Sequence, residues 1–414
     1  MTSRERVLAA LNHQPVDRVP LDIGATHNSG IHAYALKRLR RALGMDPTTR
    51  IFDPMLMTGI VEVDLAVLLG SDCIALDNPF TLAGYRNENW KPWTAPNGEE
   101  FLVGSGFETT TDGEDVYLYP QGRRDAKPSG KMNRAQPYFD SIVRQQPLDE
   151  ENMDARQDYA ADNVLLSETD LRYYEQTANR LYEETDLAIV GSFYGAGLGD
   201  MMHIQAPGLI DPPGIRDMSE WMMAPYLYPD YVHEAFAMQT EYVIENLKRY
   251  YQAVGDKICC IALAGTDFGS QRGLLYAKDA YREFYKPYFT KINQWVHDNT
   301  KWKTWYHSCG SVHELFDDFI EAGYDIINPI QITAEGMDPA ALKEHYGDKL
   351  VFWGGSINPQ KTLPFGTPEE VAAEVHHNVS ILGQNSGYVC SPIHNVTAEV
   401  PAENILALCR AVRE

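Results

Sequence analysis

The residues best suited to chemistry are a histidine and a cysteine separated by one position. His307 and Cys309 follow a β-rich run at residues 303–306, and Gly310 comes directly after them. Alternate side chains of an extended segment point to the same side, so the imidazole and the thiol are expected to face one way. Zinc takes imidazole nitrogen and thiolate sulfur in tetrahedral arrays. The pair therefore predicts half of a zinc site, and buried packing or simple hydrogen bonding is the alternative.

A third ligand must come from the end of another strand. The segment at residues 389–395 contains Cys390 and His394, and both side chains are chemically suitable. Cys390 is also explained as a small buried hydrophobe, as most free cysteines are. His394 follows Pro392 in an expected loop and is harder to explain as a core residue. From the residues alone, both candidates stay open.

Polar residues follow other expected strands. Asp267 comes after the strand expected at residues 257–264. There it could ligate a metal or accept a hydrogen bond from a histidine that does. We predict Asp267 as a catalytic residue or fourth ligand. Gln331 and Trp353 lie at later strand ends, and His27 follows the first strand. We predict these three as substrate-binding residues, with a solvated loop histidine as the alternative for His27.

Strands and helices alternate along the chain. The helices are expected at residues 2–14, 31–44, 168–184, 228–254, 277–299, 311–322, 338–346 and 368–382, with a last one near Pro401. The strands are expected at residues 19–23, 186–191, 257–264, 303–307, 325–328, 350–354 and 387–390. This alternation indicates βαβ units and a parallel sheet. So many units favour a closed (β/α)8 TIM barrel, whose chemistry lies at the carboxyl ends of the strands.

Residues 85–145 break this pattern. Pro-Asn-Gly and Asp-Gly turn signals separate short β-rich runs there. We interpret the segment as a β-hairpin insertion in the N-terminal half of the barrel, not as a separate domain. A barrel needs about 250 residues before insertions. The 414 residues therefore fit one decorated barrel spanning residues 1–414, although length alone also fits two domains.

Composition excludes several classes of partner. The formal charge of −23 is spread along the chain and argues against nucleic acid and against an anionic membrane surface. No stretch of 18 apolar residues is present, as a membrane span would require. The first twenty residues interleave charges with apolar side chains, unlike a signal peptide. We expect a cytoplasmic protein whose six cysteines are reduced.

Five segments in fixed order resemble the uroporphyrinogen decarboxylase superfamily. They are residues 3–20, 266–288, 306–331, 352–371 and 401–405. The resemblance runs over nearly the whole chain. It implies a (β/α)8 barrel with its active site at the carboxyl ends of the strands, as the alternation of elements also predicts.

The superfamily has two main branches, and the chain resembles one of them more closely. The true decarboxylases hold substrate carboxylates with an early arginine-rich motif, which the corresponding residues 20–32 lack. The other branch contains zinc-dependent methyltransferases that work with corrinoid proteins. Their signature is His-x-Cys followed much later by a cysteine, and His307 and Cys309 match its first part.

The chain departs from this signature at the last ligand. An ungapped alignment on the family's Pro-x-Glu-Asn, here residues 401–404, places His394 at the ligand position and Cys390 four residues earlier. The resemblance therefore implies a metal site of His307, Cys309 and His394, with Cys390 as the substitute. Two imidazoles and one thiolate would make zinc a stronger Lewis acid than two thiolates, which favours an ether oxygen as its target.

The resemblance implies a methyltransferase that moves a methyl group between a small methylated substrate and the cobalt of a partner corrinoid protein. Zinc and a corrinoid are the expected cofactors, and a homodimer is left open. Aromatic-rich stretches at residues 90–93 and 193–194 favour a methoxylated aromatic substrate. Three alternatives remain: a methylcobalamin:thiol methyltransferase of the coenzyme M type, a decarboxylase-like lyase without metal, and a non-catalytic corrinoid-binding protein.

Overall fold

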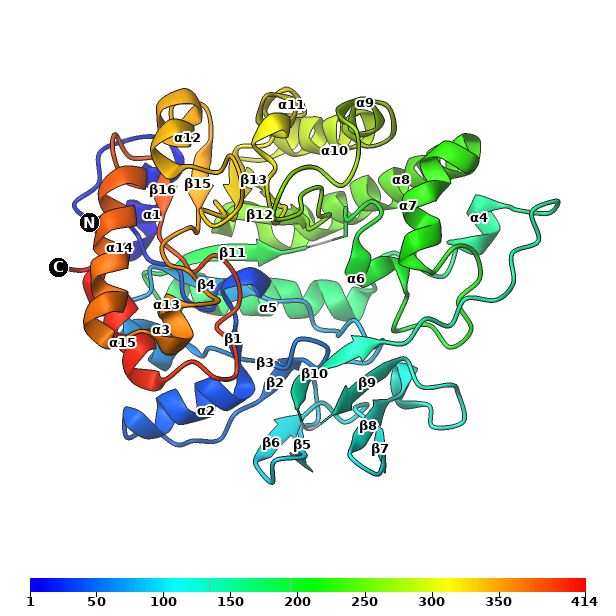
Figure 1. Ribbon diagram of the computed structural model, residues 1–414, viewed down its shortest axis with the longest axis horizontal. Helices are drawn as coiled ribbons and strands as arrows, with labels where there is room; N and C mark the ends of the chain where they lie inside the picture. The colour runs from blue at the N-terminus through cyan, green and yellow to red at the C-terminus, as the bar shows by residue number, and fades with distance from the viewer. Residues whose placement is uncertain (134, 194) are drawn as a thin grey trace.

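The centre of the molecule is a curled parallel sheet (Figure 1). The computed structural model describes residues 1–133, 135–193 and 195–414. Within these residues the sheet has seven strands, each paired in parallel with its neighbour in chain order. They are β4 (Cys73–Leu76), β11 (Ala188–Ser192), β12 (Ile258–Ala264), β13 (Lys303–His307), β14 (Ile326–Asn328), β15 (Val351–Trp353) and β16 (Tyr388–Val389).

The backbone around Leu21 closes this sheet into a barrel. Leu21 forms a parallel bridge with Cys390, and the Asp22 amide donates to the Cys390 carbonyl at 2.8 Å. On its other side, the Leu21 carbonyl accepts from the Asp72 amide at 2.7 Å, just before β4. The predicted strand at residues 19–23 is thus reduced to one bridging residue, yet it occupies the eighth position. The predicted (β/α)8 fold is confirmed.

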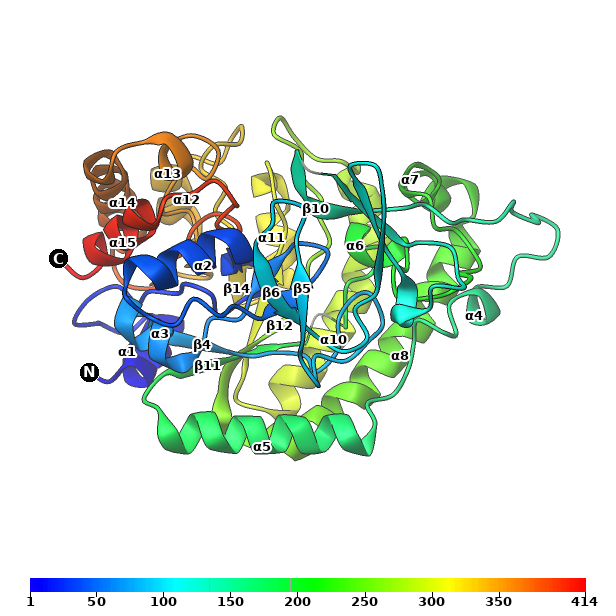
Figure 2. The same cartoon turned by 90° about the horizontal axis from the view of Figure 1, so that it is seen from below.

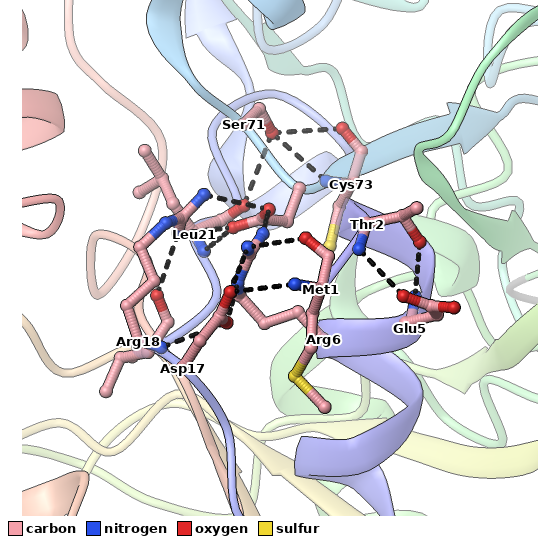
Figure 3. A network of polar contacts seen from close by, with 11 residues as sticks. Met1, Thr2, Glu5, Arg6, Asp17, Arg18, Leu21, Ser71 and Cys73 are labelled. Carbon is pink, nitrogen blue, oxygen red and sulfur yellow. Dashed lines mark hydrogen bonds and ion pairs between the residues drawn. The ribbon is translucent and has the colours of Figure 1, made fainter.

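A buried carboxylate supports the closure, and Figure 3 shows its partners Arg6, Arg18 and Leu21. The Asp72 side chain, which is fully buried, accepts from the Leu21 amide at 2.8 Å. It also pairs with Arg6 at 2.6 Å and with Arg18 at 2.7 Å. A buried charge is stable only when it is paired and hydrogen-bonded. The two arginines thereby allow a carboxylate to hold the shortest strand of the barrel in place.

Helices cover the outside of the barrel. Those that precede or follow strands β11 to β16 are α5 (Glu168–Glu184), α8 (Pro229–Val254), α10 (Lys286–Asn299), α11 (Phe316–Glu321), α12 (Pro339–Tyr346), α14 (Pro368–Leu382) and α15 (Ala402–Ala411). Shorter or N-terminal helices are α1 (Ser3–Leu11), α2 (Ala33–Ala42), α3 (Val63–Leu69), α4 (Ala155–Asp158), α6 (Met201–Ile204), α7 (Met218–Leu227), α9 (Lys278–Ala280) and α13 (Thr362–Phe365).

The sequence predicted some helix boundaries better than others. α5 and α14 coincide with prediction because the hydroxyls of Ser167 and Thr367 cap their first turns. The helix predicted at residues 277–299 is a composite, in which a π-helical turn (Tyr281–Tyr285) separates α9 from α10. α3 and β4 were not predicted from the sequence.

No helix among the described residues is long and apolar enough to cross a membrane.

Alternation along each strand separates two cores. On β13, Trp305 packs inside the barrel, whereas the next residue, Tyr306, packs outside against the helices. β15 shows the same alternation, with Trp353 inside the barrel and Phe352 outside it. This two-residue period decides which strand-end side chains enter the mouth of the barrel. His307, two residues after Trp305, is on the inner side.

The β-rich segment within residues 85–145 contains two antiparallel sheets. A hairpin pairs β5 (Lys91–Thr94) with β6 (Glu100–Val103), and a four-stranded sheet contains β7 (Thr109–Asp112), β8 (Asp115–Leu118), β9 (Gly130–Asn133) and β10 (Gln136–Ser141). These strands lie below the barrel in Figure 1 and face the viewer in Figure 2.

The insertion packs on a small sheet next to the barrel. This sheet contains β1 (Ile31–His32), β2 (Ile51–Asp53) and β3 (Thr58–Gly59), with β3 in the middle. Phe101 and Phe139 of the insertion share an apolar cluster with Ile51. The insertion is therefore fixed through a core of its own, beside the chain that leads from Leu21 into the barrel mouth.

Removing the charge of Asp72 should weaken barrel closure. Asp72→Asn leaves Arg6 and Arg18 without their buried counter-charge, so we expect the free energy of unfolding to fall by about 3–5 kcal/mol. Urea denaturation followed by circular dichroism measures it. The matched control is Asp17→Asn, whose half-exposed side chain also pairs with Arg6 and should cost less than about 1 kcal/mol. Equal losses in both variants would contradict this role of Asp72.

Candidate metal centre

Three side chains converge at the carboxyl end of the barrel. His307 is the last residue of β13, Cys309 follows two residues later, and His394 lies in the loop after β16. One ligand atom from each lies within 4.8 Å of those of the other two. The Cys309 Sγ is 3.2 Å from the His307 Nε2, and the two imidazole centroids are 5.6 Å apart. The structure thus brings together the three residues predicted as metal ligands.

The turn after β13 is tightly held. The Ser308 hydroxyl accepts from the Phe268 amide at 2.9 Å, and the Ser308 amide donates to the Asn328 carbonyl at 2.8 Å. Gly310 has φ +86°, and a Cβ there would come within 2.5 Å of the Gly269 backbone. Only glycine fits both the left-handed conformation and this close approach. The turn therefore directs Cys309 back toward His307.

Cys390 lies on the other side of the β16 segment. Val389 belongs to the inner core of the barrel, whereas Cys390 belongs to the outer core against the helices. Burial raises the pKa of the Cys390 thiol to about 12, although hydrogen bonds with Ser356 and Tyr388 oppose the shift. The predicted substitute ligand is therefore not in the group of three, because a strand alternates its side chains and the following loop turns His394 inward.

Asn328 sets the tautomer of His307. The Asn328 Oδ1 lies 2.6 Å from the His307 Nδ1, and the Asn328 amide nitrogen donates to the Trp353 carbonyl at 3.0 Å. That second bond fixes which end of the amide faces the imidazole. Nδ1 then carries the proton and donates it, so the lone pair of Nε2 points at the centre. Metal-ligating histidines are held in this way by a second residue.

The site keeps both imidazoles neutral. Burial lowers the pKa of His307 and of His394 to about 4 each. Burial, followed by the charge of nearby Asp267, raises the pKa of the Cys309 thiol well above its ordinary value. At neutral pH the two nitrogens are ready to accept a cation, and the thiol must lose its proton to do so.

Asp267 lies beside His307, Cys309 and His394 and accepts a hydrogen bond from the backbone of Cys309. The Asp267 Oδ1 accepts from the Cys309 amide at 2.6 Å and is 3.9 Å from the His307 Nε2. Burial raises the pKa of this carboxyl group. In the structure, the residue predicted as catalytic or as a fourth ligand positions the Cys309 backbone.

The residues predicted to bind substrate lie around the site in different ways. His27 is half-buried with its ring edge-on to Phe52, and burial lowers its pKa to about 4. Gln331 accepts from the Gly310 amide at 2.7 Å and so supports the turn. Trp353 is fully buried in the barrel floor, where its indole donates to Asp22 at 2.8 Å.

The two aromatic-rich stretches that favoured an aromatic substrate, residues 90–93 and 193–194, belong to other parts of the fold. Residues 90–93 belong to the start of the insertion, mostly in β5. Within the stretch at residues 193–194, Phe193 packs against Tyr250 outside the barrel, and residue 194 lies outside the described residues.

Two asparagines at the site were missed by the sequence reading. Asn328 ends β14, so the rule that selected other strand-end residues could have found it. Asn28, whose Nδ2 is 3.2 Å from the His307 Nε2, gives no such signal. It lies in a 3-10 turn far away in sequence, and only the fold brings it to the histidine.

These donors fit zinc. Zn–N and Zn–S bonds of about 2.0–2.3 Å in a tetrahedron place ligand atoms about 3.3–3.8 Å apart. The distances within the group require only small side-chain movements to reach that geometry. His307 and His394 supply nitrogen and Cys309 supplies sulfur, leaving a fourth position. Catalytic zinc sites commonly have three protein ligands and one open position.

The fold and the site define a TIM-barrel protein with a candidate metal centre at the carboxyl ends of its strands. The chain belongs to the uroporphyrinogen decarboxylase (URO-D) family, whose model matches residues 143–414. This confirms the resemblance seen in the sequence.

Two similar proteins extend the comparison. The uroporphyrinogen decarboxylase of Cellvibrio japonicus (strain Ueda107) is 25% identical over 264 residues, which cover 62% of this chain and 67% of that protein. The solved structure of a methyltransferase from Methanosarcina mazei has a TM-score of 0.58 at 20% identity, covering 100% of this chain and 98% of the other. The latter likeness shows that the fold is shared along the whole chain.

The neutral imidazoles can be observed directly. In the metal-free protein we expect the ring signals of His307 and His394 to titrate near pH 4, below the ordinary value of about 6.5. Nitrogen-15 labelling of histidine, with His307→Gln and His394→Gln for assignment, measures this by NMR. His307 should also show a protonated Nδ1 at neutral pH. Titration of either ring near its ordinary value would contradict this description of the site.

Proposed function

We propose that this protein is a zinc-dependent methyltransferase acting between a small methylated substrate and the cobalt of a corrinoid carried by a partner protein. The observation that carries the proposal is the convergence of His307, Cys309 and His394 at the mouth of the barrel. The family and the shared fold support it. A methoxylated aromatic compound is the best candidate substrate, so that the reaction would be an O-demethylation.

Zinc, when bound by these residues, would supply Lewis acidity toward the heteroatom that carries the methyl group. The residues of the chain prepare the site. Asn328 keeps the His307 Nε2 unprotonated, and Asp267 holds the Cys309 backbone. Burial of the imidazoles limits competition by protons and water. Ligands held in place beforehand lose little free energy to reorganisation during the reaction.

The charges near the site weigh against a polycarboxylate substrate such as the decarboxylase alternative requires. Asp77 follows β4, Asp200 follows β11, and Asp267 follows β12. Burial raises the pKa of all three, that of Asp77 to about 7. A polyanionic ligand nearby would raise these pKa values further, and the three carboxyl groups offer it no cationic partner. A neutral ether creates no such conflict.

Zinc content tests the ligand set. We expect wild-type protein to bind one zinc per chain, and Cys309→Ser to bind it far more weakly because the thiolate is lost. The matched control is Cys390→Ser, which removes a buried thiol from the outer face of the same barrel and should retain the zinc. Asn328→Ala, which removes the partner of His307, should weaken zinc binding about 10–100-fold. Plasma emission spectrometry and competition with a chelating dye measure these values.

The opposite pattern would identify a different site. Zinc lost from Cys390→Ser and retained by Cys309→Ser would contradict the proposed ligands. A wild-type protein that binds no zinc would remove the metal-dependent proposal and favour a lyase.

Methyl transfer is tested by a screen of methylated compounds with free cob(I)alamin, followed by its visible spectrum. We expect methoxylated aromatics to form methylcobalamin with wild-type protein, and His307→Ala to lose zinc and transfer together because Nε2 is lost. A second arm supplies methylcobalamin and small thiols, which separates the thiol-methylating alternative. Full transfer by His307→Ala would contradict the mechanism. Absence of transfer in both arms, including with a corrinoid partner, would favour a non-catalytic protein.

A further inference from the structure

A cavity lies beside the four-stranded sheet of the β-rich segment. It has a volume of about 320 Å³ and is lined by residues 127–128 and 142–146. The first pair precedes β9 and the second run follows β10, so both walls extend from the same end of one antiparallel strand pair (Figure 1). None of these residues belongs to the candidate metal centre. The cavity is therefore a separate feature of the fold.

Two cationic side chains at this cavity have no anionic partner. Lys127 is exposed at the rim, whereas only 6% of Arg144 is exposed. Lys131, on the neighbouring strand β9, pairs with Asp115 at 2.8 Å. Within the described chain, Lys127 and Arg144 form no such ion pair. Unpaired cations are informative in a chain whose formal charge is −23.

The backbone holds the Arg144 guanidinium without neutralising it. Arg144 donates to the carbonyl groups of Leu209, of Ile210 at 3.1 Å and of Ala206 at 2.6 Å. These acceptors lie between α6 and α7 and carry no net charge. The Arg144 Nε has no acceptor among the described residues. The positive charge is thus fixed in place and left without a counter-charge.

Burial makes this charge costly. It lowers the pKa of Arg144 to about 10, although the charge of exposed Asp211 opposes the shift. The guanidinium still carries its proton at neutral pH. Buried charges are stable when they are paired with the opposite charge. An anion in the cavity would therefore supply the partner that the chain itself does not provide.

The remaining walls favour an organic anion over a bare inorganic one. Pro128, Ile142 and Val143 give the cavity an apolar surface. Gln146 adds an exposed amide at the rim. Small-molecule sites combine an apolar lining with a few polar groups, and they begin at about 300 Å³. The cavity has this composition and room for a single ring.

The hydrogen bonds of Arg144 also decide between a carboxylate and a phosphate. Phosphate is commonly bound by two parallel N–H groups of one guanidinium. Here both terminal nitrogens of Arg144 already donate to backbone carbonyls. The guanidinium therefore offers its charge but no free fork, which suits an anion of one charge.

We propose that this cavity binds a small organic carboxylate, whose charge is balanced by Lys127 and Arg144 and whose apolar part contacts Ile142 and Val143. The inference does not depend on the proposed methyl transfer. Because Arg144 also anchors the segment between α6 and α7, a bound carboxylate should stabilise that segment. The melting temperature should then rise with ligand concentration.

The experiment uses the full chain and three probes in a buffer of low ionic strength. Benzoate has a ring and a carboxylate, inorganic phosphate has charge without a ring, and benzyl alcohol has the ring without charge. By calorimetry we expect benzoate to bind more tightly than phosphate and benzyl alcohol to give no binding heat. Added sodium chloride should weaken benzoate binding, because the Lys127 charge is exposed to screening.

Substitutions assign the binding to this cavity. We expect Lys127→Ala to weaken benzoate binding about tenfold, as for the loss of one hydrogen bond to a charged group. Arg144→Gln should weaken it at least as much. The matched control is Lys131→Ala, which removes an exposed cation from the same segment and should change the affinity less than about twofold. Circular dichroism checks that each variant is folded, and exposed Lys127 keeps the test valid if Arg144→Gln unfolds.

Three outcomes would overturn the proposal. The first is benzoate affinity that is unchanged in Lys127→Ala, which would place the ligand elsewhere. The second is an equal loss in Lys131→Ala, which would indicate attraction by surface charge in general. The third is binding of phosphate or benzyl alcohol as tightly as benzoate, which would reject an organic carboxylate as the ligand.

Discussion

Closure of the barrel at Leu21 is the constraint on which the rest of the structure depends. Within the described residues, the seven regular strands of the barrel sheet leave β4 and β16 as edges, and one residue joins them through backbone hydrogen bonds on both sides. So short a strand cannot hold itself by its own ladder. The carboxylate of Asp72 adds a side-chain hydrogen bond to the Leu21 amide, and its two arginine partners stabilise its buried charge.

The same segment connects closure to the candidate metal centre. Asp22, the next residue, accepts from the Trp353 indole in the barrel floor and from the turn that carries Asn28. Burial raises the pKa of Asp22 to about 6, although these donors favour its charged form. A buried carboxyl with three donors is costly to move or replace. The floor and one wall of the site are therefore fixed by the residue that follows the closing one.

Much of the fold could be predicted from the sequence because its information is local. Helices such as α5 and α14 carry their own caps, β12 is an apolar run, and β13 is a short run rich in β-forming residues that ends before Gly310. The closing strand was predicted longer than it is, because its single bridge depends on partners far along the chain. The π-helical turn before α10 was not predicted, since its apolar pattern is compatible with a continuous helix.

The sequence by itself determined that His307 and Cys309 lie two residues apart where β13 ends, which predicts that they face one way. It left the third position between Cys390 and His394 until family spacing favoured His394. The tertiary structure decided this placement, since Cys390 faces the helices and the following loop turns His394 inward. It alone brought Asn28 to His307 across 279 residues. Spacing along a strand is written in the sequence, whereas contacts between strand ends exist only after the barrel closes.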